Sequence, residues 1–390
     1  MVLFKYRRCC HCDVGPARVA ADGSAALGLY LVPKYLDDGS RNPYVIRRLK
    51  DKLGTRSVPT GEVEFNDALG YALRPRSGET GVQSDSDAGG LNRMMEMVNG
   101  SRLGVAIMGL GIARRAFLEA AIWVHHREAN GRLLVDLPLM RERLVDLLVE
   151  LEAGIALGFE AAAGQDEDGI RLRRIIIPGA KVRLCRLGVE AASQCIEVVG
   201  GNGYNEDWGL TRLLRDAQCL PIWEGSENVC ALDVLRAIRR DQAHEAALSR
   251  IDCALDRARS DGPPFLQPEI EAIRQSRNEL AMRIDNVDSV NVDRTHAVAL
   301  RLTDLFNQTL AAALLAERGT ASARKALVAA RFCGGGCAQR RAGMIRSPLV
   351  RAATCWPTPR SKLATQPALR CRETEAGDAS TGCAGGCAGG

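Results

Sequence analysis

Residues 178–201, PGAKVRLCRLGVEAASQCIEVVGG, carry a helical pattern from which the fold class can be inferred. Apolar residues recur every three or four positions, which places their side chains along one stripe of an α-helix. The glycine pair Gly200-Gly201 follows the last periodic residue, as is typical of a helix end. The stretch therefore predicts a long amphipathic helix from about Pro178 to Val199. Its apolar stripe consists of Val182, Cys185, Val189, Ala192, Ile196 and Val199.

The same period recurs in three further segments, so residues 91–240 are expected to form an antiparallel four-helix bundle. Residues 241–330 are expected to be a helical extension, with clear patterns at 267–285 and 293–317. The three further bundle helices are predicted after Ser101, from near Asp136 with Pro138 in the first turn, and from near Gly225 to about Arg240.

Residues 25–75 have a different pattern, because Ala26–Val32 and Gly61–Asp67 resemble strands in their composition and alternation. The predicted fold class is therefore mainly α: an antiparallel four-helix bundle with a helical extension, preceded by a partial β domain. The remaining segments are an irregular N-terminal segment at 1–24, a linker rich in Gly, Ser and Asp at 76–90, and a disordered low-complexity tail at 331–390.

Composition and charge exclude several classes of protein. The chain has 390 residues, 46% of them hydrophobic, but no apolar run of the roughly 18 residues that a spanning helix needs. Membrane insertion is therefore not expected, and the predicted location is the cytoplasm. Nine of the fourteen cysteines lie near the two ends, so no disulfide framework is required. The formal charge of +5 comes from residues 318–372, which contain twelve Lys and Arg and no acid, so it does not indicate a basic binding face.

The segment Pro221–Asn228, PIWEGSEN, places the carboxylate of Glu224 just before a predicted helix start. The free N–H groups of a helix N-terminus favour a developing enolate or a phosphate nearby. The pattern alone favours a simpler interpretation, in which Ser226 only caps the helix. Both interpretations stay open at this point.

Several motifs in a shared order resemble the flavin-dependent acyl-CoA dehydrogenase superfamily over residues 26–318. The Glu224-Gly225-Ser226 segment is similar to the catalytic signature of that family, and residues 198–204, VVGGNGY, are similar to its Gly-Gly-x-Gly-Tyr loop. Further matches are Arg212–Ala217 before the signature, Arg127 followed by Gly131 and Arg132, and the segments 52–56 and 59–63. The resemblance is greatest to the alkylation-response, isovaleryl-CoA dehydrogenase-like branch.

The resemblance implies FAD-dependent α,β-dehydrogenation of an acyl-CoA, with Glu224 as the α-proton base and hydride transfer to flavin N5. Ser101 occupies the position where one branch of the family has its base, so Glu224 has no competitor. Arg102 would be an electrostatic partner of the base. The implied FAD-binding residues are Arg127, contacting the pyrophosphate across a subunit interface, and Gly200, Gly201, Ser226 and Asn228. Each has a structural alternative, as a solvated arginine, a helix stop or a cap.

The resemblance also shows departures and leaves rival functions open. The Phe of the family's Arg-x-x-Phe-Gly motif is replaced by Asn130. The family's N-terminal helical domain and the first half of its β domain have no counterpart, so we expect an N-terminally truncated chain with an aberrant C-terminus. The expected partners are an acyl-CoA substrate, a second copy in a homodimer or homotetramer, and an electron-transfer flavoprotein. The alternatives are a DNA-associated alkylation-response flavoprotein with little dehydrogenase activity, although the charge of the core does not support DNA, or an inactive fragment.

No metal site is predicted. The run Cys9-Cys10-His11-Cys12 has the ligand types of a zinc site, but four adjacent residues cannot surround one ion. The pair His125-His126 points in directions about 100° apart on a helix.

Overall fold

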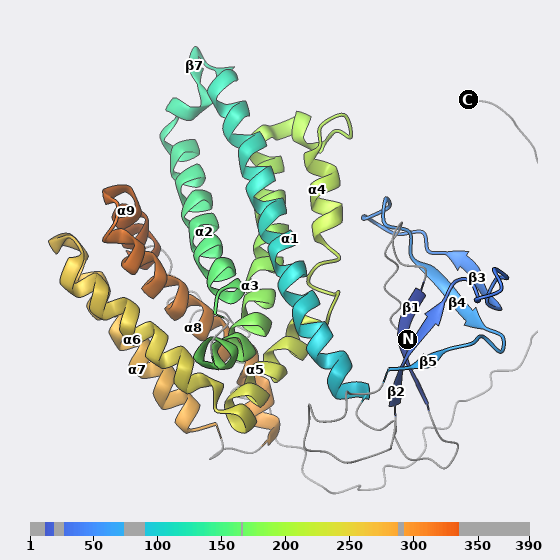
Figure 1. The fold of residues 1–390 in the computed structure, drawn as a ribbon. Coiled ribbons are helices and arrows are strands. Elements are labelled where there is room, and N and C mark those ends of the chain that lie inside the picture. Colours follow the sequence, from blue (N-terminus) through green and yellow to red (C-terminus); the bar gives the residue numbers. More distant parts are fainter. Residues whose placement is uncertain (1–11, 19–26, 74–89, 165–166, 288–291, 335–390) are drawn as a thin grey trace, which may run out of the picture. The chain divides into compact units, whose positions relative to one another are not determined.

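The computed structural model describes residues 12–18, 27–73, 90–164, 167–287 and 292–334. The mainly α prediction is confirmed, because helices make up most of this part of the chain. Three long helices, α1 (Gly90–His126), α2 (Pro138–Ala162) and α3 (Glu167–Val199), alternate in direction, so α2 is antiparallel to α1 and α3, which run the same way (Figure 1). The expected fourth bundle helix is α5 (Glu227–Asp241), which packs on α3.

Backbone contact between α1 and α3 is unusually close at two glycines. A Cβ atom added to Gly109 of α1 would lie 2.5 Å from the carbonyl oxygen of Leu184, and one added to Gly188 of α3 would lie 2.8 Å from the carbonyl oxygen of Gly109. No side chain larger than hydrogen fits between the two backbones there. The helices that carry the candidate site are therefore fixed against each other by backbone packing.

The helix α3 begins eleven residues before the predicted start at Pro178, which lies inside it. Proline lacks the N–H that would bond the carbonyl four residues earlier, so the sequence favours a helix start. The structure continues the helix because the preceding turn, Ile175–Ile177, is buried in the core. Asn307 of α8 (Val292–Gly319) also donates from its side-chain amide to the carbonyl oxygen of Gly179, at 2.8 Å. Tertiary packing outweighs the local signal here.

Two short helical elements precede α5 and complete its connection to α3. The 3-10 helix η2 (Gly200–Tyr204) follows α3 directly, and α4 (Leu210–Ala217) follows η2. The predicted start of the fourth helix near Gly225 is two residues early, because Ser226 caps α5. The 218–225 segment thus lies between two helix ends.

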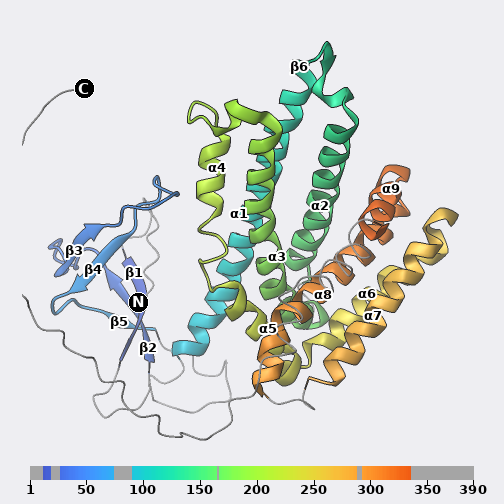
Figure 2. The ribbon, with the colours of Figure 1, turned by 180° about the vertical axis from the view of Figure 1, so that it is seen from behind.

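The helical extension continues the bundle (Figure 2). Patterns at 267–285 and 293–317 correctly predicted α7 and α8, while the expected tail boundary at 331 is too early. Phe332 is buried and still belongs to the last helix. The linker residues 76–89 and tail residues 335–390 lie outside the described residues. The helices of the extension are α6 (Ala243–Asp261), α7 (Gln267–Asp285), α8 (Val292–Gly319) and α9 (Ala323–Phe332).

The strands that the structure describes before α1 form two small antiparallel sheets. One has the order β1-β2-β5 and the other pairs β3 with β4. The N-terminal segment expected to be irregular contains β1, which pairs along its whole length with β2. The sequence does not predict this strand because Gly15 and Pro16 both have low strand propensity. Hydrogen bonding to β2 stabilises it in the folded chain. The strands are β1 (Cys12–Arg18), β2 (Leu27–Pro33), β3 (Tyr44–Leu49), β4 (Gly61–Phe65) and β5 (Tyr71–Ala72).

Candidate active site

The candidate site is built on the turn Pro221–Gly225, which leads from α4 into α5. Glu224 and Gly225 both have left-handed backbone conformations, with φ of 57° and 104°. A residue other than glycine in this region costs on the order of 1–3 kcal/mol, so surrounding contacts must hold it. The side chain of Ser226 then accepts a hydrogen bond from the backbone N–H of Val229 at 3.5 Å and caps α5.

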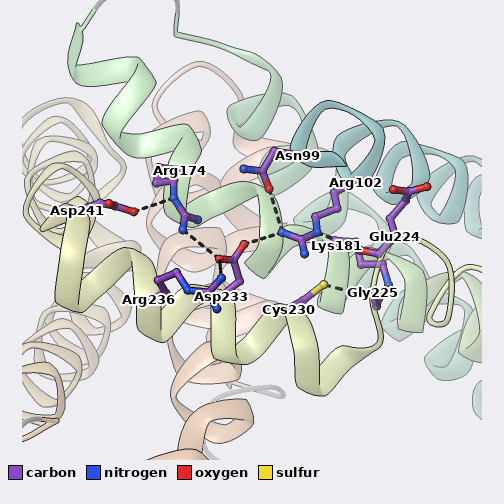
Figure 3. A network of polar contacts seen from close by, with 10 residues as sticks. All are labelled: Asn99, Arg102, Arg174, Lys181, Glu224, Gly225, Cys230, Asp233, Arg236 and Asp241. Carbon is purple, nitrogen blue, oxygen red and sulfur yellow. Dashed lines mark hydrogen bonds and ion pairs between the residues drawn. The ribbon is translucent and has the colours of Figure 1, made fainter. Parts of the chain in front are cut away.

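Two buried cations hold the carbonyl oxygens of this turn (Figure 3). The Nε atom of Arg102, on α1, donates to the carbonyl oxygen of Glu224 at 3.0 Å. The Nζ atom of Lys181, on α3, donates to the carbonyl oxygen of Pro221 at 3.1 Å and to that of Gly225. The turn is thus fixed to two long helices that are themselves packed backbone to backbone.

Arg102 is held in turn by an ion pair with Asp233 of α5. The side chains are 2% and 3% exposed, and Nη1 of Arg102 lies 2.5 Å from Oδ2 of Asp233. Asn99 accepts a further bond from Nη1 at 2.9 Å, and Arg174 contacts the other oxygen of Asp233 at 3.0 Å. Burial by itself would raise the pKa of Asp233, but Arg174 and Arg102 hold it below its usual value. Asp233 therefore remains ionised and balances the buried arginine.

The carboxyl group of Glu224 makes none of these contacts. It points away from the guanidinium of Arg102 (Figure 3), and its Oε1 atom is buried with no hydrogen-bond partner in the described part of the chain. Burial raises the pKa of Glu224, and the nearby charges of Arg102 and Lys181 offset part of that rise. A half-buried carboxylate with one buried and unused acceptor oxygen is suited to removing a proton from a bound molecule.

The thiols near the turn are not activated as nucleophiles. Burial raises the pKa of Cys185 to about 12 and also raises the pKa of Cys230. Because the thiolate is the reactive form of cysteine, neither side chain is activated.

The other predicted site residues fall into two groups. Ser226 and Asn228 are exposed at the start of α5, close in sequence to Glu224. Arg127 is exposed just after α1, and Gly200 and Gly201 are exposed just after α3. A Cβ atom at either glycine would meet no atom within 4 Å, so the described chain leaves space above this loop.

One chain does not bring these two groups together. Arg127 follows Arg102 by 25 residues of α1 and its end, which at the rise of an α-helix is roughly 37 Å. The Gly200-Gly201 loop lies at the Arg127 end, because Trp208 beyond the loop packs edge-on against Trp123 with ring centroids 5.0 Å apart. Glu224 lies beside Arg102 at the other end. The pattern alone could not show this separation.

Sequence reasoning missed Lys181 and Asp233, although both carried a signal. Lys181 lies four residues before Cys185 on the predicted apolar stripe of its helix, and Asp233 lies between the apolar pairs Cys230-Ala231 and Val234-Leu235. A charge on the buried stripe of an amphipathic helix requires a buried partner. Here those partners are backbone carbonyls for the lysine and arginines for the aspartate.

Among the residues that the structure describes, no group of three or more His, Cys, Asp or Glu could hold a metal ion. The run Cys9–His11 lies outside them. No described helix combines the length and the apolar character needed to cross a membrane.

Comparison with known proteins identifies the bundle. Residues 88–239 match the family "Acyl-CoA dehydrogenase, C-terminal domain". AidB of Escherichia coli (strain K12) is 36% identical over 226 residues, which cover 57% of this chain and 40% of AidB. The expected alkylation-response branch agrees with this relative.

Solved structures show the same fold. Caenorhabditis elegans ACDH-11, in complex with C11-CoA, superposes with a TM-score of 0.74 and 28% identity, covering 82% of this chain and 56% of that chain. An acyl-CoA dehydrogenase complexed with FAD from Bacillus anthracis has a TM-score of 0.66 at 15% identity, which shows a likeness of fold alone. It covers 87% of this chain and 62% of that chain. This chain therefore contains, over residues 88–239, an acyl-CoA dehydrogenase C-terminal domain.

Proposed function

We propose that this protein catalyses FAD-dependent α,β-dehydrogenation of an acyl-CoA thioester, with Glu224 as the α-proton base. The observation that carries the proposal is the buried, unpartnered Oε1 atom of Glu224 on a turn held by Arg102 and Lys181. The matched family and the acyl-CoA complex of ACDH-11 support the substrate class.

The chemistry of the base follows from its surroundings. Glu224 takes the proton from the carbon next to the thioester carbonyl, and its raised pKa makes the carboxylate a stronger base than an exposed glutamate. Arg102 and Lys181 limit that rise, so the group still ionises. Bound FAD would accept the β-hydrogen as hydride at N5. An acyl chain that fills the site would remove water from the carboxylate and strengthen the effect of burial.

The residues for FAD fit a site shared between two chains. Gly200 and Gly201 leave open space at the same end of the bundle as the exposed Arg127, which suits the approach of a pyrophosphate. Ser226 and Asn228 lie with Glu224 at the start of α5, where N–H groups and the helix dipole favour a phosphate. Because these groups lie far apart in one chain, each chain would supply the base to one FAD and Arg127 to another, as in a homodimer or homotetramer.

The surface around Glu224 indicates which kind of acyl group the substrate carries. Ile222 and Val229 flank the base and are 70% and 49% exposed, so they offer apolar surface to a fatty or branched acyl chain. An electron-transfer flavoprotein is the proposed acceptor. DNA is not proposed as a partner, because Arg274, Arg277 and Arg283 of α7 are each paired with an acidic residue.

The test compares Glu224→Gln with Glu227→Gln, which changes the next glutamate along the chain, at the start of α5. FAD and a saturated acyl-CoA are supplied, and both product formation and deuterium exchange at the α-carbon are measured. Glu224→Gln should lower both rates by about 10²–10⁴-fold, since it removes the general base. Glu227→Gln should change them little. Rates for Glu224→Gln within threefold of the parent would refute the assignment of the base.

A further inference from the structure

Lys181 is the most deeply buried charged group beside the turn that carries Glu224. Its side chain is 0% exposed, in the middle of α3. It donates to two backbone carbonyl oxygens, of Pro221 and Gly225, and forms no ion pair with a carboxylate in the described chain. Burying an ammonium group costs several kcal/mol unless its hydrogen bonds are satisfied. An apolar side chain would fill the same place without that cost, so the amino group has a specific role.

The two carbonyls that Lys181 binds are the two ends of the turn. Pro221 and Gly225 are four residues apart, and a single Nζ atom joins them. The carbonyl of Glu224 lies between them and is bound by Arg102 from the opposite helix. Together the two cations occupy three carbonyl oxygens of a five-residue segment, so the backbone of Glu224 cannot rotate without breaking charged hydrogen bonds.

The backbone conformation explains why such a clamp is needed. Glu224 at φ 57° and Gly225 at φ 104° form a left-handed pair, which is unfavourable for glutamate. If the turn relaxed to an ordinary conformation, the side chain of Glu224 would change direction. The carboxylate would then leave the position in which one oxygen is buried and unused.

We propose that Lys181 is a positioning residue for the base: it holds the Pro221–Gly225 turn in its left-handed form and thereby aims the carboxylate of Glu224 at the substrate. This inference rests on the proposed function of Glu224. The charged groups that act on the carboxylate are Arg102 from α1 and Lys181 from α3. The ammonium of Lys181 lowers the pKa of Glu224 against the larger effect of burial. It therefore has an electrostatic role beside the mechanical one.

The first measurement needs no cofactor or substrate. Lys181→Met keeps an unbranched side chain of similar length and removes the donor, and hydrogen exchange of the peptide covering 219–229 is followed by mass spectrometry. Loss of the clamp should speed exchange in this peptide roughly ten- to hundredfold, while the buried segment 302–316 of α8 stays protected. The control is Lys325→Met, which removes a partner of the buried Glu152 in another part of the bundle. It should leave 219–229 unchanged.

The second measurement separates positioning from stability. With FAD and acyl-CoA supplied, Lys181→Met should lower kcat more than it raises KM, and it should shift the acid limb of kcat/KM to higher pH. Lys181→Ala should regain part of the lost rate with propylammonium ions, which fit the vacated space and restore a donor. Tetramethylammonium ions, which cannot donate, should have no effect. Lys181→Ala with propylammonium also serves if Lys181→Met does not fold.

The outcomes distinguish this inference from the proposed function. Unchanged exchange at 219–229 in a folded Lys181→Met protein would overturn the clamp, whatever the activity of the chain. Faster exchange with an unshifted acid limb and no rescue would overturn the positioning role. If Glu224→Gln keeps its activity, the proposed function fails first, and the role of Lys181 toward the base fails with it.

Discussion

Arg102 binds Glu224 through the backbone and not through the carboxylate. Its Nε atom lies 3.0 Å from the carbonyl oxygen of Glu224, while its Nη1 atom is committed to Asp233 and Asn99. The sequence led us to expect an electrostatic partner for the base. The structure adds that the arginine fixes the turn and leaves the carboxyl group free to exchange a proton.

The ion pair between Arg102 and Asp233 should be important for stability. Asp233→Asn keeps the shape of the side chain but leaves Arg102 buried without a counter-charge, so the free energy of unfolding should fall by about 3–5 kcal/mol. Asp241→Asn is the control, because Asp241 also pairs with Arg174 but is 42% exposed, and such pairs contribute about 0–1 kcal/mol. Urea unfolding of both variants checks this. Equal effects would show that the buried pair has no special weight.

Stability should depend on pH through Glu224. Burial raises the pKa of this carboxyl group in the folded protein, so its contribution to stability is present below the unfolded pKa of about 4.3 and is lost as pH rises through the folded pKa. Glu224→Gln removes this loss. The variant should become progressively more stable than the parent as the pH rises from 4 to 7. This difference should be about the same with and without FAD. A constant difference across this range, in thermal melts at each pH, would contradict the raised pKa.

The catalytic rate should depend on ionisation of the same carboxyl group, but it should rise with pH where the stability falls. The base must be ionised, so kcat/KM should fall as pH decreases through the pKa of Glu224, at a pH above that of an ordinary glutamate. The acid limb should be measured with substrate well below KM, so that it reports the free enzyme. A limb at or below the usual glutamate pKa would show that burial does not control this carboxyl group.

The close packing of α1 on α3 predicts opposite effects for two neighbouring glycines. Gly109→Ala places a methyl group against the backbone of α3 and should destabilise the protein by about 1–3 kcal/mol. Gly111→Ala meets no atom within 4 Å on the same helix, and should stabilise it by roughly 0.5–1 kcal/mol through helix propensity. Chemical denaturation of the two variants tests the geometry. The same sign of change in both would argue against the close approach.

The end of α9 sets the point to which the chain can be shortened without loss of core packing. A chain ending at Arg331 lacks the buried side chains of Phe332 and Cys333, whereas a chain ending at Gly334 keeps them. Loss of the phenyl ring alone should lower the free energy of unfolding by about 1.5–3 kcal/mol. Comparing the melting temperatures of the two truncated chains tests this. Equal values would place the boundary at 331, as the sequence pattern indicates.

The period and the motifs of the sequence predicted the helical architecture and singled out Glu224 as the candidate base. The period of 3.6 residues is a local property, so the stripes of α1, α2, α7 and α8 could be read directly. The order of motifs around Gly200 and Glu224 pointed to the acyl-CoA dehydrogenase C-terminal domain, which the comparisons confirm over residues 88–239. The predicted start of α3 at Pro178 was wrong, because burial of the isoleucines at 175–177 outweighs the local effect of the proline.

Which groups surround Glu224, and in what arrangement, depends on how the helices pack in the folded chain. Lys181, Arg102 and Asp233 come from three helices. The contacting pair Arg102 and Asp233 lies 131 residues apart in sequence. No local pattern encodes which charge faces which carbonyl, because that depends on how the helices pack. The raised pKa of Glu224 likewise arises from burial, which exists only once the helices have packed. The separation of Arg127 from the base is also a property of the folded chain, since it follows from the rigid length of α1.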